Sequence, residues 1–426
     1  MTDAPGAARA AARAILRAND RGGYTVPSAR LYPFQWNWDS ALVAMGWATC
    51  SESRGWQEVE TLLAGQWDDG MVPHILFHAP SGDYFPGPAV WGLARLRVPS
   101  SGIPQPPVLA TAVRRMLERA RAPEQAKARA AALYPKLLGN HRWWARARDP
   151  ERRGLVTTLH PWETGMDNSP AWDIALARVP RETGTPIVRR DLAHVESAMR
   201  PALAEYERYI HLVDLFRSLA WEPGRMLRQS PFRVADVGTN AILLRAERDL
   251  LALARRFGTA AEGAEIDARS ARLAAALEGL FSATEGIYLG RDQVADRPIT
   301  VATSAGLLPI FAGERAHAGA LAERIESWRS AAVPWPVPSS APGGPGFDPR
   351  RYWRGPVWPF VNWMLAQGFA AAGNAALASL LGNATARMIE TGGFYEYFDP
   401  RDASGLGGEN FSWTAAIWLV LAESRP

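Results

Sequence analysis

Two acidic residues that lie far apart in the chain each stand among aromatic residues. Asp167 belongs to the segment HPWETGMDNSPAWD (160–173), and Glu396 belongs to GGFYEYFDP (392–400). A carboxyl group set against indole rings such as that of Trp162 has a poorly solvated ionised form, which raises its pKa and leaves a proton available near neutral pH. We therefore predict that Asp167 is a general acid and Glu396 its partner. Because tryptophan faces also stack on sugar rings, this pair suggests acid/base chemistry on a sugar.

Each of the two carboxylates also has a structural explanation. Ser169 and Pro170 form an N-cap followed by a proline at the first helical position, which accounts for the turn after Asp167. Glu396 could be an edge-strand glutamate paired with an arginine, although strand alternation places it on the same face as two phenylalanines, a poor position for a charge. Glu409, in GGENFSW, is a second candidate for the role of Glu396.

A further aromatic segment, LYPFQWNWDSALVAMGW (31–47), contains Trp36 and Asp39. Asp39 could cap the following helix with Ser40, or it could accept hydrogen bonds from sugar hydroxyls while Trp36 supplies a stacking wall. In QWDDGMVPHI (66–75), His74 is more typical of a structural histidine. The remaining predicted substrate contacts are tryptophan, polar or glycine residues of these and similar segments: Gln66, Trp67, Trp162, Gly165, Trp353, Arg354, Gly355, Trp358, Trp363 and Trp413.

The composition argues against several classes of protein. The 47 Lys and Arg residues exceed the 43 Asp and Glu residues by only four and are scattered along the chain, so no nucleic-acid partner is expected despite a pI of 9.4. No HExxH, CxxC, phosphate-loop, dinucleotide or GxSxG motif is present, so we expect no metal and no cofactor. A single Cys50, no secretory signal and no membrane-spanning apolar stretch favour a cytoplasmic protein.

Apolar residues recur at helical spacing through most of the chain and predict a dozen helices. These span residues 7–18, 40–50, 56–66, 108–120, 124–147, 192–221, 235–257, 261–281, 316–328, 356–372, 375–391 and 411–421. Hydrophobic turns that begin with glycine recur between them, at Gly70, Gly154, Gly286 and Gly393. Such a repeat is typical of stacked helical hairpins, which form an α/α toroid around a central cavity when they close into a ring.

Two long irregular segments, 79–107 and 330–350, interrupt the predicted helices. Loops of this length inside a compact fold are either functional or disordered. Because Trp335 and Phe347 are uncommon in disordered linkers, we expect the second segment to be ordered or to close over the cavity. Neither segment marks a domain boundary, so we predict one all-α domain that covers residues 1–426.

Five blocks of the sequence, in order, resemble glycoside hydrolase family sixty-three: FQWNWDSAL, QWDDGMVPHI, ETGMDNSPAWD, YWRGPVWPFVNWM and GGFYEYFDP. The short members of the family that the chain resembles are bacterial mannosylglycerate and glucosylglycerate hydrolases. The resemblance implies an (α/α)6 barrel and inverting hydrolysis of an α-linked sugar, with Asp167 as general acid and Glu396 as general base. Inversion requires room for a water molecule, so the two carboxyl groups are expected about 6.5 to 9.5 Å apart.

The glycerate part of such a substrate is an anion and needs a cationic partner. Arg200 and Tyr206 lie in MRPALAEYERY (199–209), at a predicted helix entrance, and an arginine can bind a carboxylate through two parallel hydrogen bonds. The resemblance favours both residues as glycerate contacts, with Gln66 and Tyr84 as further ones. The alternative is a surface helix with ordinary charges.

The sequence thus predicts an inverting α-glycosidase that releases mannose or glucose from a small glycerate glycoside. Two other functions stay open, namely a trehalase-like or oligosaccharide α-glucosidase on the same toroid and a non-catalytic sugar-binding protein. The segment QWDDGMVP stands where trehalases carry QWDYPNGW, which speaks against trehalase specificity.

Overall fold

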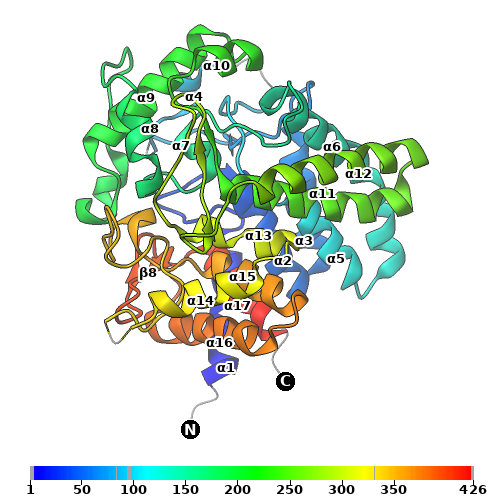
Figure 1. Ribbon diagram of the computed structural model, residues 1–426. Helices are drawn as coiled ribbons and strands as arrows, with labels where there is room; N and C mark the ends of the chain where they lie inside the picture. Colours follow the sequence, from blue (N-terminus) through cyan, green and yellow to red (C-terminus); the bar gives the residue numbers. More distant parts are fainter. Residues whose placement is uncertain (1–3, 83, 94–96, 331, 424–426) are drawn as a thin grey trace.

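The computed structural model describes residues 4–82, 84–93, 97–330 and 332–423. Within these residues, six helices form a closed ring in which each helix contacts the next and the last contacts the first (Figure 1). In ring order they are α2 (Asn37–Cys50), α5 (Leu109–Glu118), α11 (Val237–Phe257), α13 (Pro309–Ala312), α15 (Pro359–Ala371) and α17 (Ser412–Ala422). The predicted toroid is confirmed, and its architecture is that of an (α/α)6 barrel.

A second set of helices covers the ring from outside. These are α1 (Ala4–Asn19), α3 (Glu52–Ala64), α6 (Pro123–Arg148), α12 (Ala260–Glu278), α14 (Ala318–Trp328) and α16 (Ala375–Gly392). Helix α3 packs on α2, α6 on α5, α12 on α11, α16 on α15 and α1 on α17. Helices α3, α6, α12 and α16 each follow their inner partner in the chain, so helical hairpins build most of the barrel.

The sequence of each helix explains its layer. In α17, SWTAAIWLVLA is apolar almost all round, and residues 412–421 are all buried. In α12, the buried apolar residues Ile266, Leu273 and Leu277 recur on one stripe, and most of the other positions are charged or alanine. A helix that is apolar all round belongs inside a protein, whereas an amphipathic helix lies at the surface.

Eleven of the twelve predicted helices match an observed helix within four residues at each end. The prediction for 192–221 is wrong in its first half, where two short 3-10 turns, Arg190–Ala193 and Ser197–Met199, precede α9 (Leu203–Ser218). Pro201 explains the break, because a proline disfavours the helical conformation of the residue before it. Short helices that the sequence did not reveal are α4 (Pro88–Trp91), α7 (Pro161–Thr164), α8 (Asp173–Ala177), α10 (Pro223–Gln229) and the ring helix α13.

The short helices α4, α7, α8 and α10, together with α9, gather beside the barrel (Figure 1). Their apolar side chains form a second hydrophobic cluster that is separate from the core of the ring. This second cluster includes Trp91, Trp162, Tyr209 and Phe216. We call the elements of this cluster the cap. The segment 79–107 belongs largely to it, because α4 interrupts this predicted loop.

The strands are short and antiparallel, and lie in the connections between helices. They are β1 (Gln35–Trp36) with β2 (Ile75–Leu76), β3 (Val234–Ala235) with β6 (Arg291–Asp292) and β7 (Arg297–Pro298), β4 (Phe281–Ser282) with β5 (Ile287–Tyr288), and β8 (Tyr397–Phe398) with β9 (Gly405–Leu406). The registers pair Trp36 with Ile75 and Phe398 with Gly405. Strand β1 holds Trp36 of the candidate site described below, and Glu396 directly precedes β8.

The four glycine turns predicted from the repeat all have positive φ, between +61° and +103°. Only glycine adopts this conformation without strain. At Gly154 a Cβ atom would also lie 2.7 Å from the Cβ of Ala276, so the turn packs directly against α12. The other long segment, 330–350, is held by backbone contacts, among them Trp335 N–H to the Pro400 carbonyl at 3.1 Å.

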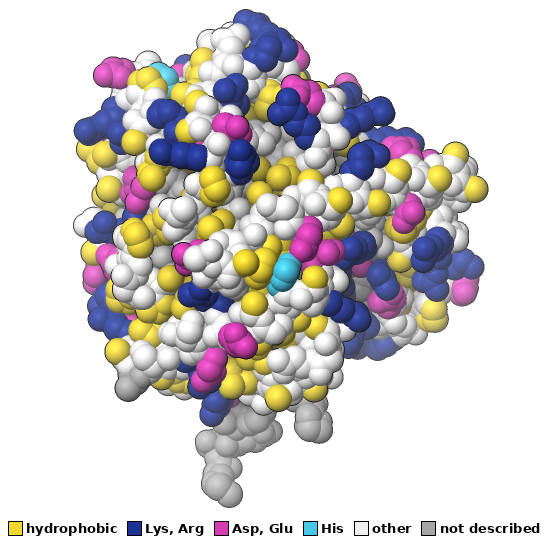
Figure 2. Space-filling model, viewed as in Figure 1, with side chains coloured by type: hydrophobic (Ala, Val, Ile, Leu, Met, Phe, Trp, Pro, Cys, Tyr) yellow, Lys and Arg dark blue, Asp and Glu magenta, His cyan; other side chains and the backbone are white. Residues whose placement is uncertain are grey.

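Basic and acidic side chains are interspersed over the face shown in Figure 2. Many such residues pair across elements, as Arg248 of α11 does with Glu314 at 2.6 Å. Pairs of this exposed kind contribute little to stability, so the fold rests on the two hydrophobic clusters. In the part of the chain that the structure describes, no helix has the length and apolar character needed to cross a membrane.

Candidate active site

A pocket opens where the N-terminal ends of the ring helices meet the cap. Asp39 and Trp413 lie in the first turns of α2 and α17, and Gln105 and Tyr352 lie shortly before α5 and α15. Ten predicted site residues line this pocket: Trp36, Asp39, Tyr84, Trp162, Gly165, Asp167, Arg200, Tyr206, Glu396 and Trp413. Residues from opposite ends of the chain therefore meet in one cavity, which we call the sugar cavity.

Asp167 lies in the tight connection between α7 and the 3-10 turn Pro170–Trp172. Gly165 ends α7 with a φ of +67°, and a Cβ atom there would lie 2.4 Å from the ring of Trp38. Ser169 caps the following turn by accepting a hydrogen bond from Ala171 N–H, as predicted. The Tyr209 hydroxyl donates to the backbone carbonyl of Asp167 at 2.9 Å. The backbone is thus fixed on both sides of Asp167, and its side chain faces the cavity.

The carboxyl group of Asp167 holds its proton unusually well. The pKa of Asp167 is raised to about 7, mainly by burial; Arg200 opposes this shift and nearby Glu396 adds to it. Among the described residues, no side chain donates a hydrogen bond or forms an ion pair with the Asp167 carboxyl. At neutral pH this group exists in both protonation states, as a proton donor requires.

Glu396 directly precedes β8 and is fully buried. Its Oε2 accepts a hydrogen bond from Gly408 N–H at 3.1 Å, and its Oε1 accepts one from the Tyr32 hydroxyl at 3.0 Å. Gly407 has a φ of +73°, and a Cβ atom there would lie 2.5 Å from Oε2, so only glycine permits this close approach. Burial raises the pKa of Glu396, while Arg200 and the hydrogen bonds lower it.

Arg200 is the cation of the sugar cavity, and it is buried. Its Nη1 donates to the Tyr32 hydroxyl at 2.8 Å and lies 3.8 Å from Glu396 Oε2. Its Nε donates to Asp191 at 3.2 Å, and its guanidinium lies over the Tyr352 ring at 4.5 Å. Glu396 therefore does lie close to an arginine, as the structural alternative for this residue supposed. Both Glu396 and Arg200 nevertheless line the cavity.

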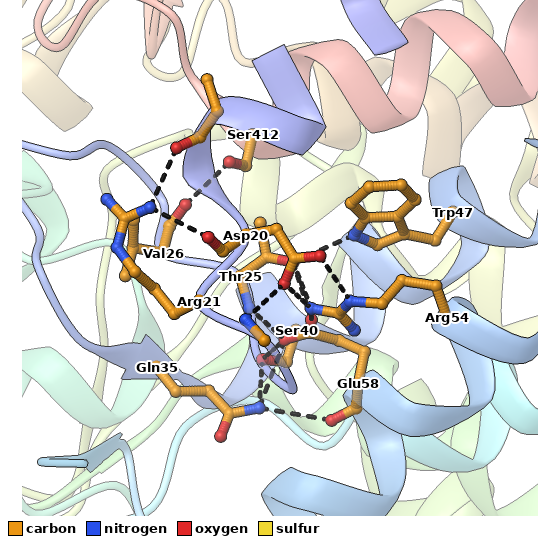
Figure 3. A network of polar contacts seen from close by, with 12 residues as sticks. Asp20, Arg21, Thr25, Val26, Gln35, Ser40, Trp47, Arg54, Glu58 and Ser412 are labelled. Carbon is orange, nitrogen blue, oxygen red and sulfur yellow. Dashed lines mark hydrogen bonds and ion pairs between the residues drawn. The ribbon is translucent and has the colours of Figure 1, made fainter. Parts of the chain in front are cut away.

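A buried polar network around Glu58, shown in Figure 3, holds the chain neighbours of Asp39 and Trp36. Glu58 of α3 accepts hydrogen bonds from Ser40 Oγ at 2.7 Å and from Gln35 Nε2 at 3.2 Å. These two donors are the direct chain neighbours of Asp39 and Trp36. Trp36 itself occupies the N-cap position of α2, so Asp39 and Ser40 do not cap the helix.

The Asp39 carboxyl is free to receive a ligand. Among the described residues no side chain hydrogen-bonds or pairs with it, and burial raises its pKa well above the ordinary value, with Glu396 and Asp167 adding to this shift. Three carboxyl groups of one cavity thus influence one another. Such a group can donate to or accept from a sugar hydroxyl according to its protonation state.

Seven predicted contacts lie outside the sugar cavity: Gln66, Trp67, Trp353, Arg354, Gly355, Trp358 and Trp363. Gln66 donates to two backbone carbonyls, of Gly70 and Lys136, both at 2.9 Å, and Trp67 donates to Ser100 Oγ at 3.0 Å. The side chains of Gln66 and Trp67 therefore form hydrogen bonds within the fold and do not face the sugar cavity.

The other five of these residues lie in the segment 352–363. Trp353 and Trp358 stack on each other with ring centroids 3.8 Å apart, and both are buried in the ring core. Arg354 pairs with Asp173 and with Glu205. A Cβ atom on Gly355 would lie 2.5 Å from the Asp348 carbonyl, so Gly355 packs against backbone and not against a cavity floor. Trp363 lies in a different pocket, below the guanidinium of Arg115.

Two further acidic residues are placed away from the cavity. Glu409, the second candidate for the role of Glu396, is half-exposed and pairs with Arg30 at 2.7 Å. Glu163 is buried and pairs with Arg148 at 2.7 Å, which accounts for a carboxylate in the tryptophan-rich segment. No described residue of 330–350 lines the cavity; in contrast, Tyr84 and Phe85 of segment 79–107 do.

Several residues of the sugar cavity are not among the predicted ones: Tyr32, His74, Gln105, Asp191 and Tyr352. The sequence favours a structural role for His74, yet this residue lines the cavity and its Nδ1 has no partner among the described residues. Burial lowers the pKa of His74 well below its ordinary value, so the ring is neutral. The presence of His74 in the same block, QWDDGMVPHI, as other candidates was the available signal.

The described residues contain no group of three or more His, Cys, Asp or Glu residues placed to hold a metal ion. What the cavity offers is a proton donor with a pKa of about 7, a second carboxylate, a fixed cation and indole faces. This set can protonate a leaving group, deprotonate a water molecule and bind an anion beside a sugar.

Comparison with known proteins gives consistent results. Residues 32–414 match a family described as the mannosylglycerate hydrolase MGH1-like glycoside hydrolase domain. A mannosylglycerate hydrolase of Thermus thermophilus is 50% identical over 409 residues, which cover 95% of this chain and 98% of the relative. A glucosylglycerate hydrolase of Mycolicibacterium hassiacum is 37% identical over 432 residues, covering 97% and 96%. The solved structure of the Thermus thermophilus family 63 mannosylglycerate hydrolase with Tris and D-glycerate superposes with a TM-score of 0.94, 49% identity and coverage of 97% and 100%.

Proposed function

The chain belongs to the mannosylglycerate hydrolase MGH1-like glycoside hydrolase family, and from this premise we propose that it hydrolyses the α-glycosidic bond of mannosylglycerate or glucosylglycerate. The products are the free sugar and glycerate. The observation that carries this proposal is the arrangement of Asp167, Glu396 and Arg200 in one cavity.

In the proposed reaction, Asp167 is the general acid. Its pKa of about 7 leaves it protonated in a large fraction of molecules at neutral pH, and the proton passes to the glycosidic oxygen as the bond to the anomeric carbon breaks. Glu396 is the general base and removes a proton from the water molecule that attacks the opposite face of the sugar. The product then has the inverted configuration, which requires carboxyl groups about 6.5 to 9.5 Å apart.

The proposed contacts divide the substrate into two parts. Asp39 and His74 receive hydroxyls of the sugar, whose ring is enclosed by the indoles of Trp36, Trp162 and Trp413. Arg200 binds the glycerate carboxylate, with the hydroxyls of Tyr84 and Tyr206 beside it. Because Asp191 holds Nε of Arg200 and Tyr32 receives Nη1, the guanidinium is fixed before substrate arrives.

The function is tested by incubating the purified chain with mannosylglycerate, glucosylglycerate and the neutral disaccharide trehalose. Proton NMR during the first minutes shows which anomer is released before it equilibrates. We expect the β anomer of the sugar from an α-linked glycerate glycoside and no release from trehalose. Release of the α anomer would contradict inversion, and equal turnover of trehalose would favour a trehalase-like α-glucosidase.

Replacement of Arg200 with Gln is expected to raise KM for a glycerate glycoside by about tenfold to a hundredfold, which corresponds to about 1.5 to 3 kcal/mol for a charge-assisted hydrogen bond. The corresponding glycerol glycoside lacks the carboxylate, so its KM should change much less. The measurement is KM for both substrates in both proteins. Because Arg200 also lowers the pKa of Glu396, its loss should raise that pKa. The acidic limb of the pH profile of the variant should therefore shift to higher pH.

The pH dependence of kcat/KM is expected to be bell-shaped. Asp167 must be protonated, so activity falls above pH of about 7, which is the pKa of this group. Glu396 must be ionised, and burial raises its pKa above the ordinary 4.5, so activity falls below a pH somewhat higher than that value. Initial rates between pH 4 and pH 9 check this, and a rate that stays constant up to pH 9 would exclude Asp167 as the acid.

A further inference from the structure

A second pocket lies among the ring helices themselves. Its lining comes from α5, α11, α13 and α15 and from Arg119, which follows α5, and none of its residues lines the sugar cavity. Its volume is about 190 Å³. A single water molecule needs only about 10 to 15 Å³ of such space, so the pocket has room for a small molecule of several atoms. We call it the ring pocket.

Three polar atoms in the lining of the ring pocket are buried and lack a partner. They are Thr111 Oγ1, Arg115 Nη2 and Trp363 Nε1, and none of them hydrogen-bonds to any residue that the structure describes. Thr111 is 4% exposed and Trp363 is 2% exposed. Buried polar groups in proteins nearly always have a partner, so these three atoms need partners from outside the protein chain.

The lining of the ring pocket also holds more arginines than carboxylates. Asp249 accepts from Arg114 at 2.9 Å and from Arg245 at 2.8 Å, so its carboxylate is already shared by two cations. Glu118 pairs with Arg114 at 2.7 Å. In the described part of the chain, the nearest carboxylate to Arg115 is that of Glu423, at 3.9 Å, which is too far for a hydrogen bond.

The environment of Arg115 is one in which an anion is favourable. Burial, with a contribution from the neighbouring charge of Arg119, lowers the pKa of Arg115 to about 10, while Glu423 opposes this shift. The group is still charged at neutral pH, and the indole of Trp363 lies 5.9 Å from its guanidinium carbon. The Arg115 side chain is 14% exposed, and its buried Nη2 has no hydrogen-bonded partner among the described residues. A charge largely removed from water without such a partner is costly, and an anion beside it reduces that cost.

We propose that the ring pocket binds a small oxyanion between Arg115 and Trp363. The unpartnered indole N–H and guanidinium N–H groups can only donate, and the Thr111 hydroxyl can donate as well. A ligand that satisfies all three must offer several acceptors and a negative charge, as phosphate, sulfate or a carboxylate does. The site is independent of the sugar cavity and of the reaction proposed for it.

Thermal unfolding of the full chain in inorganic phosphate tests this proposal, with sodium chloride used to hold the ionic strength constant. A ligand that binds only the folded protein raises the unfolding temperature as its concentration rises. We expect phosphate to raise this temperature more than chloride does. Arg115→Gln should weaken the apparent affinity for phosphate by about tenfold or more, and Trp363→Phe by about threefold to tenfold.

Arg129→Gln is the matched control, because it removes the same charge from α6, outside both cavities, and should leave the phosphate effect unchanged. Trp363→Phe keeps the aromatic ring and removes a donor that has no protein partner, so the variant is expected to fold normally. A phosphate effect equal to that of chloride, or one that persists fully in Arg115→Gln, would overturn the proposal.

A crystal soaked in tungstate, a tetrahedral oxyanion visible by anomalous scattering, locates the ligand directly. A peak between Arg115 and Trp363 supports the proposal, and parallel soaks in acetate distinguish a carboxylate site from a phosphate-like one. Water alone in the ring pocket, or a peak only beside Arg200, would exclude it.

Discussion

Asp167→Asn is expected to lower kcat for a glycerate glycoside by about 10²- to 10⁴-fold, the range that general acid catalysis contributes. The amide keeps the size and shape of the side chain but cannot release a proton to the glycosidic oxygen. An activated aryl glycoside has a leaving group that departs without protonation, so its kcat should fall much less. The measurement is kcat for both substrates in the wild type and in the variant.

Asp173→Asn is the control for this variant and should retain most of the activity, because Asp173 lies only six residues further along the chain and outside the sugar cavity.

The pH dependence of stability gives a second test of the Asp167→Asn variant. The pKa of Asp167 rises from 3.8 to about 7 on folding, so the wild type loses stability as pH rises from about 4 to 7. Asp167→Asn lacks this loss and should unfold at a higher temperature at pH 8, with no such advantage below pH 4. Nearly unchanged kcat for the glycerate glycoside would exclude Asp167 as the acid.

Glu396→Gln is expected to reduce kcat by a similar factor, about 10²- to 10⁴-fold, for both kinds of substrate. Its target is the attacking water, so a better leaving group does not compensate. Azide needs no deprotonation and is expected to restore part of the rate by forming a glycosyl azide of inverted configuration. The measurement is the rate of sugar release with and without azide, together with NMR of the product.

Glu409→Gln is the matched control for Glu396→Gln. Glu409 is half-exposed and pairs with Arg30, so its loss should leave kcat within about twofold of the wild type. If Glu409→Gln were inactive and Glu396→Gln active, the assignment of the base would be reversed. A rescued azide product of retained configuration would argue against inversion.

The sequence was sufficient to predict the barrel, because helical periodicity and glycine turns are local signals. It also indicated Asp167, Glu396 and Arg200, since a charged residue in an apolar segment has few structural explanations. The structure brings all three into one cavity.

The tryptophans were harder to assign, for a physical reason. An indole ring fills a core and stacks on a sugar with the same flat face, so Trp353 and Trp358 could not be told from Trp36 by sequence. The structure stacks the first two on each other in the core and leaves Trp36 at the cavity. Tyr352 could not be predicted either, because it reaches the cavity through a backbone conformation with a φ of +45°, which is rare for tyrosine.

The division of the molecule into ring and cap has a consequence for how such enzymes diversify. Glu396 and Asp39 come from segments at the mouth of the ring, whereas Asp167, Arg200 and Tyr206 come from the cap and the segments that enter it. On the proposed assignment, substitutions in residues 190–209, which include Arg200 and Tyr206 but not the sugar contact Trp162, would change which leaving group is accepted without disturbing the helices that form the barrel. A chimera that receives this stretch from a relative with another aglycone should inherit the donor's leaving-group preference and keep the parent's hexose.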